Sequence, residues 1–237
     1  MITVDFQCLP LAKNDRILDI GCGSGRHTAA AYDLQKGLVI GADPNFPDLK
    51  EAGSRLELHA CLNQRQKGGW ALAAADITNL PFKNASFDLV ICSEVLEHIA
   101  DHRRAIQESI RVLKPGCQLV VSVPRQWPET LSWALSRQYR HSPGGHLRIY
   151  NAKKLIRLIQ SEGPALWRIH YAHSLHAPYW WLKCLLGIDR RPLWPVALYH
   201  RFLTWDMMQK PPLTRHLERW LDPVMGKSVV LYFRKYR

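Results

Sequence analysis

The sequence predicts an α/β fold in which a mostly parallel sheet carries helices on both faces. In the first half of the 237-residue chain, short apolar runs alternate with segments whose apolar residues recur at helical spacing, as β-α-β units require. The hydrophobic fraction of 47% and the charged fraction of 22% are those of an ordinary globular protein. This length suits one sizeable domain with added loops, so we predict a single domain over residues 1–237.

The expected elements follow one another along the chain. Strands are predicted at 16–20, 38–42, 70–75, 87–92, 117–123, 167–172 and 228–235. In segment 101–113, Ile106, Ile110 and Leu113 recur at helical spacing, and Lys114-Pro115-Gly116 is expected to stop the helix. A further helix is predicted at 153–161.

Two segments exceed what a minimal α/β domain needs, at about 124–151 and 173–227. Long insertions in a compact domain are usually binding loops or lids, so we predict that both cover a substrate. Five of the nine tryptophans lie in the second segment, and they are Trp180, Trp181, Trp194, Trp205 and Trp220.

The positive charge is concentrated in the second half of the chain. Residues 1–124 hold 13 Lys and Arg against 14 Asp and Glu, whereas residues 125–237 hold 19 against 6. Such asymmetry indicates an anionic partner, namely a phosphate-bearing substrate, a nucleic acid or an acidic membrane surface. The alternative is that the charge only keeps an aromatic-rich surface in solution.

A glycine-rich turn follows the first predicted strand and carries the strongest motif. The strand ends in Asp19, and Gly21, Gly23 and Gly25 come next, where backbone must pass close to a ligand. A dinucleotide fingerprint has its third glycine three positions after the second, whereas here that position is Arg26. An acid at the strand end would repel a diphosphate and suits a ligand with an ammonium group.

Further acids follow the next two strands. Asp43 lies 22 residues after Gly21, a distance at which a carboxylate accepts hydrogen bonds from both ribose hydroxyls of an adenosine. Asp76 and Ile77 follow the third strand. A glycine turn without a ligand remains the alternative for the first motif. The glycine turn, Asp43 and Asp76 nevertheless all point to the same kind of ligand.

Over residues 16–123, this order of motifs resembles the class I S-adenosylmethionine-dependent methyltransferases. The resemblance implies a Rossmann-like, seven-stranded, mostly parallel sheet with an antiparallel last strand, and S-adenosyl-L-methionine as cofactor. It also implies that Asp76 receives the adenine amino group and that Ile77 addresses the ring. The cofactor-binding residues predicted in this way are Asp19, Gly21, Cys22, Gly23, Gly25, Asp43, Pro44, Asp76, Ile77 and Ser93.

The run Glu94-Val95-Leu96-Glu97-His98 places two carboxylates beside an imidazole. In a helical turn these side chains project from neighbouring positions, and the carboxylates repel one another unless a proton, a cation or a basic partner intervenes. The run resembles the ExxEH element of ubiquinone-biosynthesis O-methyltransferases and plant small-RNA 2′-O-methyltransferases. That resemblance implies a metal such as Mg²⁺ held by Glu94, Glu97 and His98, with His146 as fourth ligand. The alternative is an acidic-rimmed cofactor pocket in which His98 packs or acts as a base.

Methylation of a hydroxyl gains from a general base, because the hydroxyl ionises far above neutral pH. Imidazole titrates near neutrality, so His98 and His146 are the predicted bases, and Glu94 is the third predicted catalytic residue. Whether the two histidines converge is left open by the sequence.

The segment 176–186 is aromatic and apolar and is followed by Arg190 and Arg191. This mixture is typical of membrane–water interfaces, but plain packing and nucleic-acid stacking remain alternatives. There is no apolar run long enough for a membrane span, no basic-then-apolar start and no CxxC pair among the six cysteines. We therefore expect a cytoplasmic protein, in association with a membrane if the interface interpretation holds.

Three functions stay open. The first is methylation of a hydroxyl on a small, lipophilic or anionic molecule. The second is RNA methylation through the basic half, and the absence of a recognisable RNA-binding module makes nucleic acid the less favoured partner. The third is a non-catalytic relative that only binds the cofactor. The acceptor and the oligomeric state are not predicted.

Overall fold

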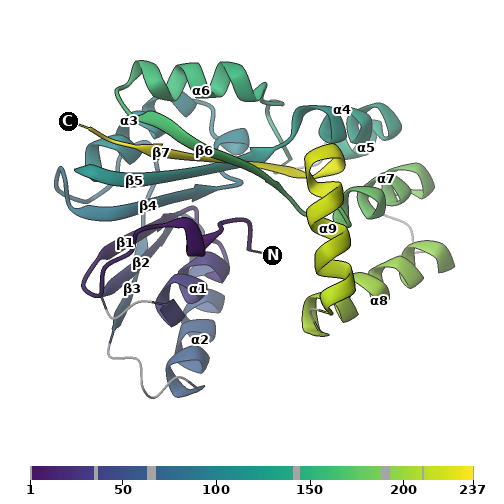
Figure 1. The fold of residues 1–237 in the computed structure, drawn as a ribbon, viewed down its shortest axis with the longest axis horizontal. Helices are drawn as coiled ribbons and strands as arrows, with labels where there is room; N and C mark the ends of the chain where they lie inside the picture. The colour runs from purple at the N-terminus through teal and green to yellow at the C-terminus, as the bar shows by residue number, and fades with distance from the viewer. Residues whose placement is uncertain are drawn as a thin grey trace.

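The computed structural model describes residues 2–34, 37–62, 68–140, 145–187, 193–209 and 211–236. Its sheet has seven strands in the order β3-β2-β1-β4-β5-β7-β6 (Figure 1). They are β1 (Arg16–Ile20), β2 (Leu38–Asp43), β3 (Gly69–Ala74), β4 (Phe87–Ser93), β5 (Leu113–Pro124), β6 (Ala165–Ala172) and β7 (Ser228–Arg234). β7 runs antiparallel to β5 and β6, and the other pairs are parallel. The predicted fold class is confirmed.

Helices cover both faces of the sheet, and alternation along the strands supplies a core for each. Leu18 points into the core with α3 (His102–Val112) and α6 (Ala152–Ser161). Ile17, one residue earlier, packs on the other face with α1 (Arg26–Leu34) and α2 (Phe46–Leu62). Successive side chains of a strand point to opposite faces, so strands buried on both faces are apolar at nearly every position.

The segment after α3 differs from the prediction. Lys114-Pro115-Gly116 was expected in a turn, but β5 begins directly at Leu113. The helix ends because Leu113 is extended (φ −77°, ψ 133°), and Leu113 then pairs with Phe87 before the register shifts. Gly116 takes φ +80°, so the loop-forming sequence forms an irregularity at the beginning of a strand.

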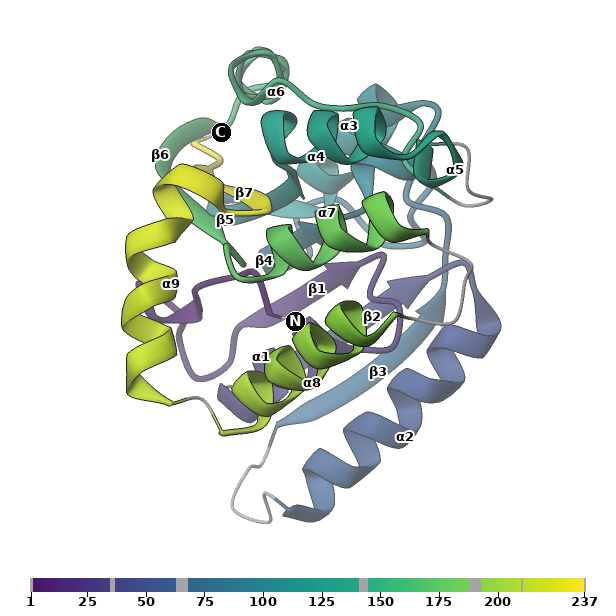
Figure 2. The same ribbon diagram turned by 90° about the vertical axis from the view of Figure 1, so that its right-hand side faces the viewer.

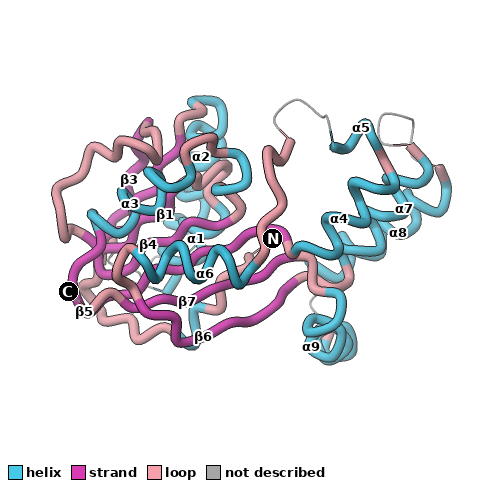
Figure 3. The backbone as a smooth tube through the Cα atoms, turned by 90° about the horizontal axis from the view of Figure 1, so that it is seen from above, coloured by secondary structure: helices cyan, strands magenta, loops and turns pink. Residues whose placement is uncertain are grey.

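The two predicted insertions form helices near the ends at which β4, β5 and β6 stop (Figures 1 and 2). They are α4 (Gln126–Leu135), α5 (Arg137–Arg140), α7 (His176–Leu186), α8 (Trp194–Gln209) and α9 (Pro212–Met225). Viewed from above, these helices extend beyond the sheet on one side (Figure 3). Arg190 and Arg191 lie outside the described residues. None of the helices among the described residues has the length and apolar character to span a bilayer.

Candidate active site

Two cavities meet where β1 and β4 end, at the point where the strand order reverses direction. In open α/β sheets, ligands bind at such a switch point. The first cavity measures about 220 Å³ and takes its walls from the ends of β1 and β2, the turn after β3, and the segment after β4. The predicted cofactor residues that line it are Gly21, Asp43, Pro44, Asp76 and Ile77.

The glycine turn leaves no room for larger residues at its first position. Gly21 has φ +65°, and a Cβ there would come within 2.3 Å of Val95 Cγ2. Gly23 donates its backbone N–H to Asp43 Oδ2 at 2.9 Å, which ties the turn to the end of β2. Glycine is therefore required at position 21, because the backbone has a positive φ and a side chain would collide with Val95. Gly21 lines both cavities, and we call the turn 21–25 the cofactor cradle.

Two predicted cofactor residues line neither cavity. Asp19 is 2% exposed and accepts a hydrogen bond of 2.6 Å from Thr28 Oγ1, and burial raises the pKa of this carboxyl to about 7. Gly25 lies against Ala52, whose Cβ would be 2.8 Å from an added Cβ. In this structure, Asp19 and Gly25 support the turn from behind.

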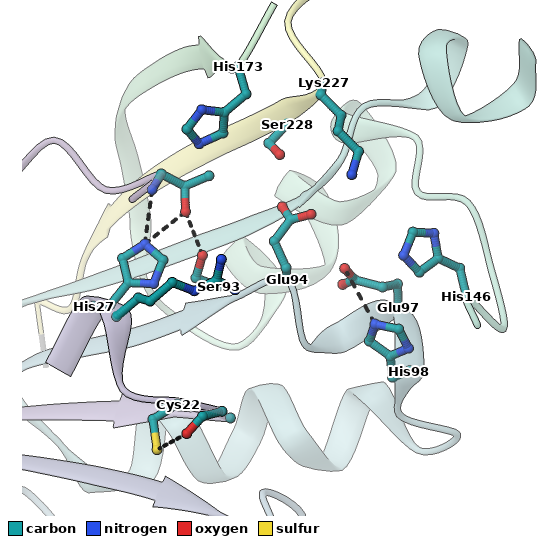
Figure 4. Close-up of a pocket in the computed structure, with 14 residues that line it drawn as sticks. Cys22, His27, Ser93, Glu94, Glu97, His98, His146, His173, Lys227 and Ser228 are labelled. Carbon is teal, nitrogen blue, oxygen red and sulfur yellow. Dashed lines mark hydrogen bonds and ion pairs between the residues drawn. The ribbon is translucent and has the colours of Figure 1, made fainter. Parts of the chain in front are cut away.

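The second cavity measures about 370 Å³ and is the more polar environment (Figure 4). The predicted residues that line it are Gly21, Cys22, Gly23, Ser93, Glu94, Glu97, His98 and His146. His146 comes from the connection between α5 and α6, so a residue distant in sequence does join Glu97 and His98. The His98 and His146 rings lie 5.0 Å apart between centroids, so the two histidines converge.

His146 is oriented by a residue that the sequence did not reveal. Its Nδ1 lies 2.6 Å from Glu129 Oε1, and Glu129 on α4 is only 2% exposed. Trp133 Nε1 also donates to this carboxylate at 3.1 Å. A carboxylate at Nδ1 fixes the tautomer that leaves the lone pair on Nε2.

The acidic run is not one continuous helical turn. Glu94 adopts φ +57°, and only Leu96–His98 forms a short 3-10 helix. Ser122 Oγ donates to Glu94 Oε1 at 3.1 Å, and Lys227 lies nearby on the same cavity wall. Burial raises the pKa of Glu94, and the ammonium group of Lys227 opposes that rise. Lys227 is thus the basic partner that the acidic run required.

Glu97 is compensated less, although Lys227 also acts to lower its pKa and His98 Nε2 lies 4.0 Å from its Oε1. Its side chain is fully buried, and neither carboxylate oxygen has a hydrogen-bond partner. Burial and the neighbouring Glu94 raise the pKa of Glu97 well above its ordinary value. A carboxyl group in this condition holds a proton or faces a cation.

Three of the four predicted metal ligands come together. Single ligand atoms of Glu97, His98 and His146 all lie within 4.8 Å of one another, whereas Glu94 is not part of this group. His98 Nδ1 lies 3.2 Å from the carbonyl oxygen of Gly145, which leaves the lone pair on Nε2, 4.0 Å from Glu97 Oε1. Two imidazoles and one carboxylate suit a first-row transition metal better than Mg²⁺, which prefers oxygen ligands.

A hydrogen-bonded chain crosses the floor of the second cavity. Thr3 Oγ1 lies 2.9 Å from His27 Nε2 and 2.7 Å from Ser93 Oγ, and Ser93 Oγ lies 2.8 Å from Ser122 Oγ. Burial lowers the pKa of His27 to about 4, so its ring is neutral and accepts the backbone N–H of Thr3. The chain therefore links the N-terminal segment to Glu94.

Several lining residues were not predicted, and they are Thr3, Arg26, His27, His173, Lys227 and Ser228. Arg26 and His27 directly follow the glycine turn, whereas Thr3, His173, Lys227 and Ser228 come from segments without a motif. Lys227 and Ser228 are recognisable only as the start of a strand, and no pattern in the sequence shows where that strand pairs. The pairing of Pro124 with Ser228 brings them to the cavity.

Comparison with known proteins agrees with this geometry. Residues 18–121 match the family described as the methyltransferase domain. Demethylmenaquinone methyltransferase of Lactiplantibacillus plantarum is 39% identical over 112 residues, which cover 46% of this chain and 45% of that protein. The 27-O-demethylrifamycin SV methyltransferase of Amycolatopsis mediterranei is 34% identical over 113 residues, covering 48% and 40%. The chain thus spans less than half the length of these curated relatives.

Similarity of fold extends further than similarity of sequence. A candidate methyltransferase from Bacillus halodurans C-125 superposes with a TM-score of 0.64 over 98% of this chain and 97% of its own, at 20% identity. The fold and the glycine turn define a cofactor-binding α/β protein of the methyltransferase type. Residues 18–121 thus form a methyltransferase domain of the class I S-adenosylmethionine-dependent type, as the motifs between Asp19 and Asp76 predicted.

Proposed function

We propose that this protein transfers a methyl group from S-adenosyl-L-methionine to a hydroxyl of a small, lipid-like molecule. The observation that carries the proposal is the pair Glu129–His146, whose imidazole lines the second cavity beside the cofactor cradle. The named relatives methylate small molecules, which agrees with a cavity of this size. The helices of 124–151 and 173–227 are then the cover of the acceptor side.

In this proposal, the first cavity binds the cofactor and the second binds the acceptor. The cofactor, when bound, supplies an activated methyl group on a sulfonium. Asp43 and Asp76 line the first cavity as acceptors for the nucleoside, and Gly21 lets it approach the backbone. Alignment of acceptor and methyl supplies much of the rate of such a displacement.

His146 is the proposed general base. Its Nε2 takes the proton of the acceptor hydroxyl as the oxygen forms its bond to the methyl carbon and the carbon–sulfur bond breaks. Glu129 then stabilises the imidazolium through the hydrogen bond at Nδ1. His98, whose ring packs against that of His146, and Glu94 are proposed to orient the acceptor.

The experiment measures transfer of label from methyl-labelled cofactor into a lipid and small-molecule extract. We expect His146→Asn and Glu129→Gln to lower transfer by about 10²–10⁴-fold while cofactor affinity stays within a few fold. The matched control is His59→Asn, which removes another histidine–carboxylate pair (His59 Nδ1 to Asp33 Oδ2, 2.8 Å) on the outer helices.

Three outcomes would overturn the proposal. Cofactor binding without transfer into any fraction would identify a non-catalytic relative. Label entering RNA alone would favour the nucleic-acid alternative. Full transfer by the Glu129→Gln and His146→Asn variants would show that His146 is not the base, although the protein would still be a methyltransferase.

A second candidate mechanism uses a divalent cation in the same cluster. It is favoured by the buried, unpartnered oxygens of Glu97 beside His98 and His146. A bound cation would acidify the acceptor hydroxyl in place of a base. None of the comparisons that we report names a metal, and the ligand set gives no support to Mg²⁺.

The two mechanisms predict different effects of Glu97→Gln and of EDTA on methyl transfer. If a cation is used, Glu97→Gln and treatment with EDTA both abolish transfer, and a first-row metal restores it to the native protein only. If His146 is the base, EDTA has no effect, and Glu97→Gln keeps most of the activity because a neutral amide replaces a carboxyl that already holds a proton.

We also propose that α8 and α9 dock on an anionic membrane. Four apolar residues of α9 recur every three or four positions and therefore lie on one side of the helix. They are Leu213, Leu217, Trp220 and Val224, and their exposed fractions are 79%, 46%, 84% and 66%. The inward face of α9 instead buries Thr214 and Glu218. A helix with its apolar side outward requires a partner surface.

Helix α8 repeats this arrangement with Trp194, Leu198, Trp205 and Met208, all of them exposed. The exposed charges of the two helices are basic (Arg201 and Arg219), whereas their acids are buried or half-buried. Tryptophan beside arginine is typical of helices that bind anionic lipid at the interface. A lipid-like acceptor would be delivered from that surface.

Sedimentation with vesicles tests the docking. We expect binding to vesicles of phosphatidylcholine with phosphatidylserine, weaker binding to phosphatidylcholine alone, and a loss of at least tenfold in Leu217→Ser/Trp220→Ser. The control Leu58→Ser/Leu62→Ser removes equally exposed leucines from α2. Equal binding by both double variants, or a stable dimer that buries α9, would overturn the membrane interpretation.

A further inference from the structure

A second cluster of metal-binding side chains lies in the helical part of the chain, outside the residues matched by the family. His173 follows β6, His176 begins α7 and Glu218 lies on α9. One ligand atom of each lies within 4.8 Å of the other two. The three residues line a cavity of about 380 Å³ that is separate from the cofactor cavity.

Buried polar atoms in this cavity lack partners. They include Nε2 of His173, Nδ1 of His176 and Oδ1 of Asp206, and His176 and Asp206 are 7% and 0% exposed. A buried polar atom without a hydrogen bond costs about 1–3 kcal/mol, so several in one place need an occupant that satisfies them. A bound cation satisfies imidazole nitrogens directly.

The backbone that carries the histidines is held firmly. Asp222 Oδ1 accepts the backbone N–H of Ser174 at 2.9 Å, and Ser174 Oγ donates to the Glu218 carbonyl at 3.3 Å. His173 itself adopts φ +66°, a costly conformation for a residue with a Cβ. The turn between β6 and α7 is thus fixed against α9 in a form that brings two imidazoles together.

The charges around the cluster are mixed, because Lys227 and Arg215 as well as Asp206 act on His176. Arg215 Nη1 donates to Glu218 Oε2 at 2.7 Å and its other end pairs with Asp206. A carboxylate has a second oxygen, so Glu218 can bind a metal while Arg215 orients it, which is the usual arrangement around ligating carboxylates.

We propose that His173, His176 and Glu218 bind a divalent first-row transition metal of the Zn²⁺ class. Two imidazoles and one carboxylate are the ligand set of such ions rather than of Mg²⁺ or Ca²⁺. His173 also lines the second cavity with Glu94 and Lys227 (Figure 4). The ion joins β6, α7 and α9 and thereby fixes the wall of the acceptor side.

Calorimetric titration of metal-free protein with Zn²⁺ tests this site. We expect saturable binding at His173, His176 and Glu218, a loss of at least 10-fold in affinity in His176→Gln and Glu218→Gln, and a higher melting temperature with Zn²⁺ in the native protein only. Glu218→Gln keeps an acceptor for Arg215, so it remains informative if His176→Gln folds poorly.

A matched control separates this cluster from the one in the active site. His98→Gln removes a ligand from the group Glu97, His98 and His146 and leaves His173, His176 and Glu218 intact. Zn²⁺ affinity that falls in His98→Gln but not in His176→Gln and Glu218→Gln would overturn the proposal, as would the absence of saturable binding. The measurement does not depend on methyl transfer, so its failure is distinguishable from failure of the proposed function.

Discussion

The cofactor side and the acceptor side of this molecule are built in opposite ways. Between β1 and β4, the site consists of backbone turns and strand-end carboxylates placed by a sheet that is apolar on both faces. Beyond β5, it consists of side chains from helices that bury polar residues such as Glu129 and Glu218 and expose tryptophans. In the proposed function, the first arrangement holds the cofactor and the second holds the acceptor.

The net charge also differs between the cofactor side and the acceptor side. The cofactor side is balanced, and all the excess positive charge belongs to residues 125–237. Buried acids occur on both sides, with Asp19 at the end of β1 and Glu129 and Glu218 on the helices. Burial raises the pKa of Asp19 to about 7, while Glu129 is hydrogen-bonded to His146. The difference between the sides is therefore one of surface charge, and a basic surface is suited to anionic surroundings.

The largest effect is expected at the cofactor cradle. Gly21→Ala places a Cβ 2.3 Å from Val95 Cγ2 at φ +65°, so both strain and collision push the turn into the cavity. We expect affinity for S-adenosylhomocysteine, measured by calorimetry, to fall by more than 100-fold. Zn²⁺ binding at His173, His176 and Glu218 should persist, because that cluster is independent of the turn.

Gly53→Ala is the control for this substitution. Gly53 lies inside α2, and its added Cβ would make only an ordinary contact of 3.6 Å with Leu72 Cδ1. Alanine in a helix interior is favoured by about 1 kcal/mol, so we expect unchanged cofactor affinity and a slightly higher melting temperature. Equal loss in both variants would show that general destabilisation, rather than the cradle, controls binding.

A smaller effect is expected from the buried acid at the end of β1. The pKa of Asp19 is raised to about 7 in the folded protein, whereas in the unfolded chain it is close to 4. Between these values the folded protein binds more protons than the unfolded chain, so the stability that Asp19 contributes at low pH is lost as pH rises from 4 to 7. Without cofactor, the loss is on the order of 2–4 kcal/mol.

Asp19→Asn removes this titration while an amide oxygen still accepts the hydroxyl of Thr28. The free energy of unfolding in urea should therefore be higher in the variant than in the native protein at pH 8, with the difference shrinking towards pH 4.5. A difference that is the same at both pH values would contradict the raised pKa. On the acceptor side, Asp206→Asn is the contrasting case, because its ion pair with Arg215 lowers the pKa of that carboxyl.

The sequence was informative where local pattern determines structure. The strand 16–20 was predicted at its observed bounds. Asp43 ends β2, and Asp76 and Ile77 follow β3, so these residues lie together because parallel strands end at one edge of the sheet. Lys114-Pro115-Gly116 misled the prediction of β5, since strand pairing with Phe87 overrode the turn preference. Local propensity is a weak guide when a neighbouring strand supplies hydrogen bonds.

The acceptor side was predictable only in part. His146 was identified through a resemblance, but nothing in the run around Glu129 indicates that α4 would present it to that imidazole. Glu218 on α9 likewise meets His173 and His176, which lie 45 and 42 residues earlier along the chain. Such contacts depend on helix packing, whose geometry is not encoded in any periodicity of a single segment.

The smallest predicted effect concerns the hydrogen-bonded chain that joins the two sides. Thr3→Val keeps the shape of the side chain but removes the hydroxyl that lies between His27 and Ser93, leaving both without that partner in a buried place. We expect a loss of about 1–2 kcal/mol in the free energy of unfolding, measured in urea. Thr130→Val, which removes a hydroxyl from the exposed surface of α4, should cost less than about 0.5 kcal/mol. If the chain only anchors the N-terminal segment, methyl transfer by Thr3→Val keeps its native pH profile. Because the chain ends at Glu94, whose pKa is already raised, a shift of that profile would instead show that the cofactor side controls the protonation of an acceptor-side carboxylate.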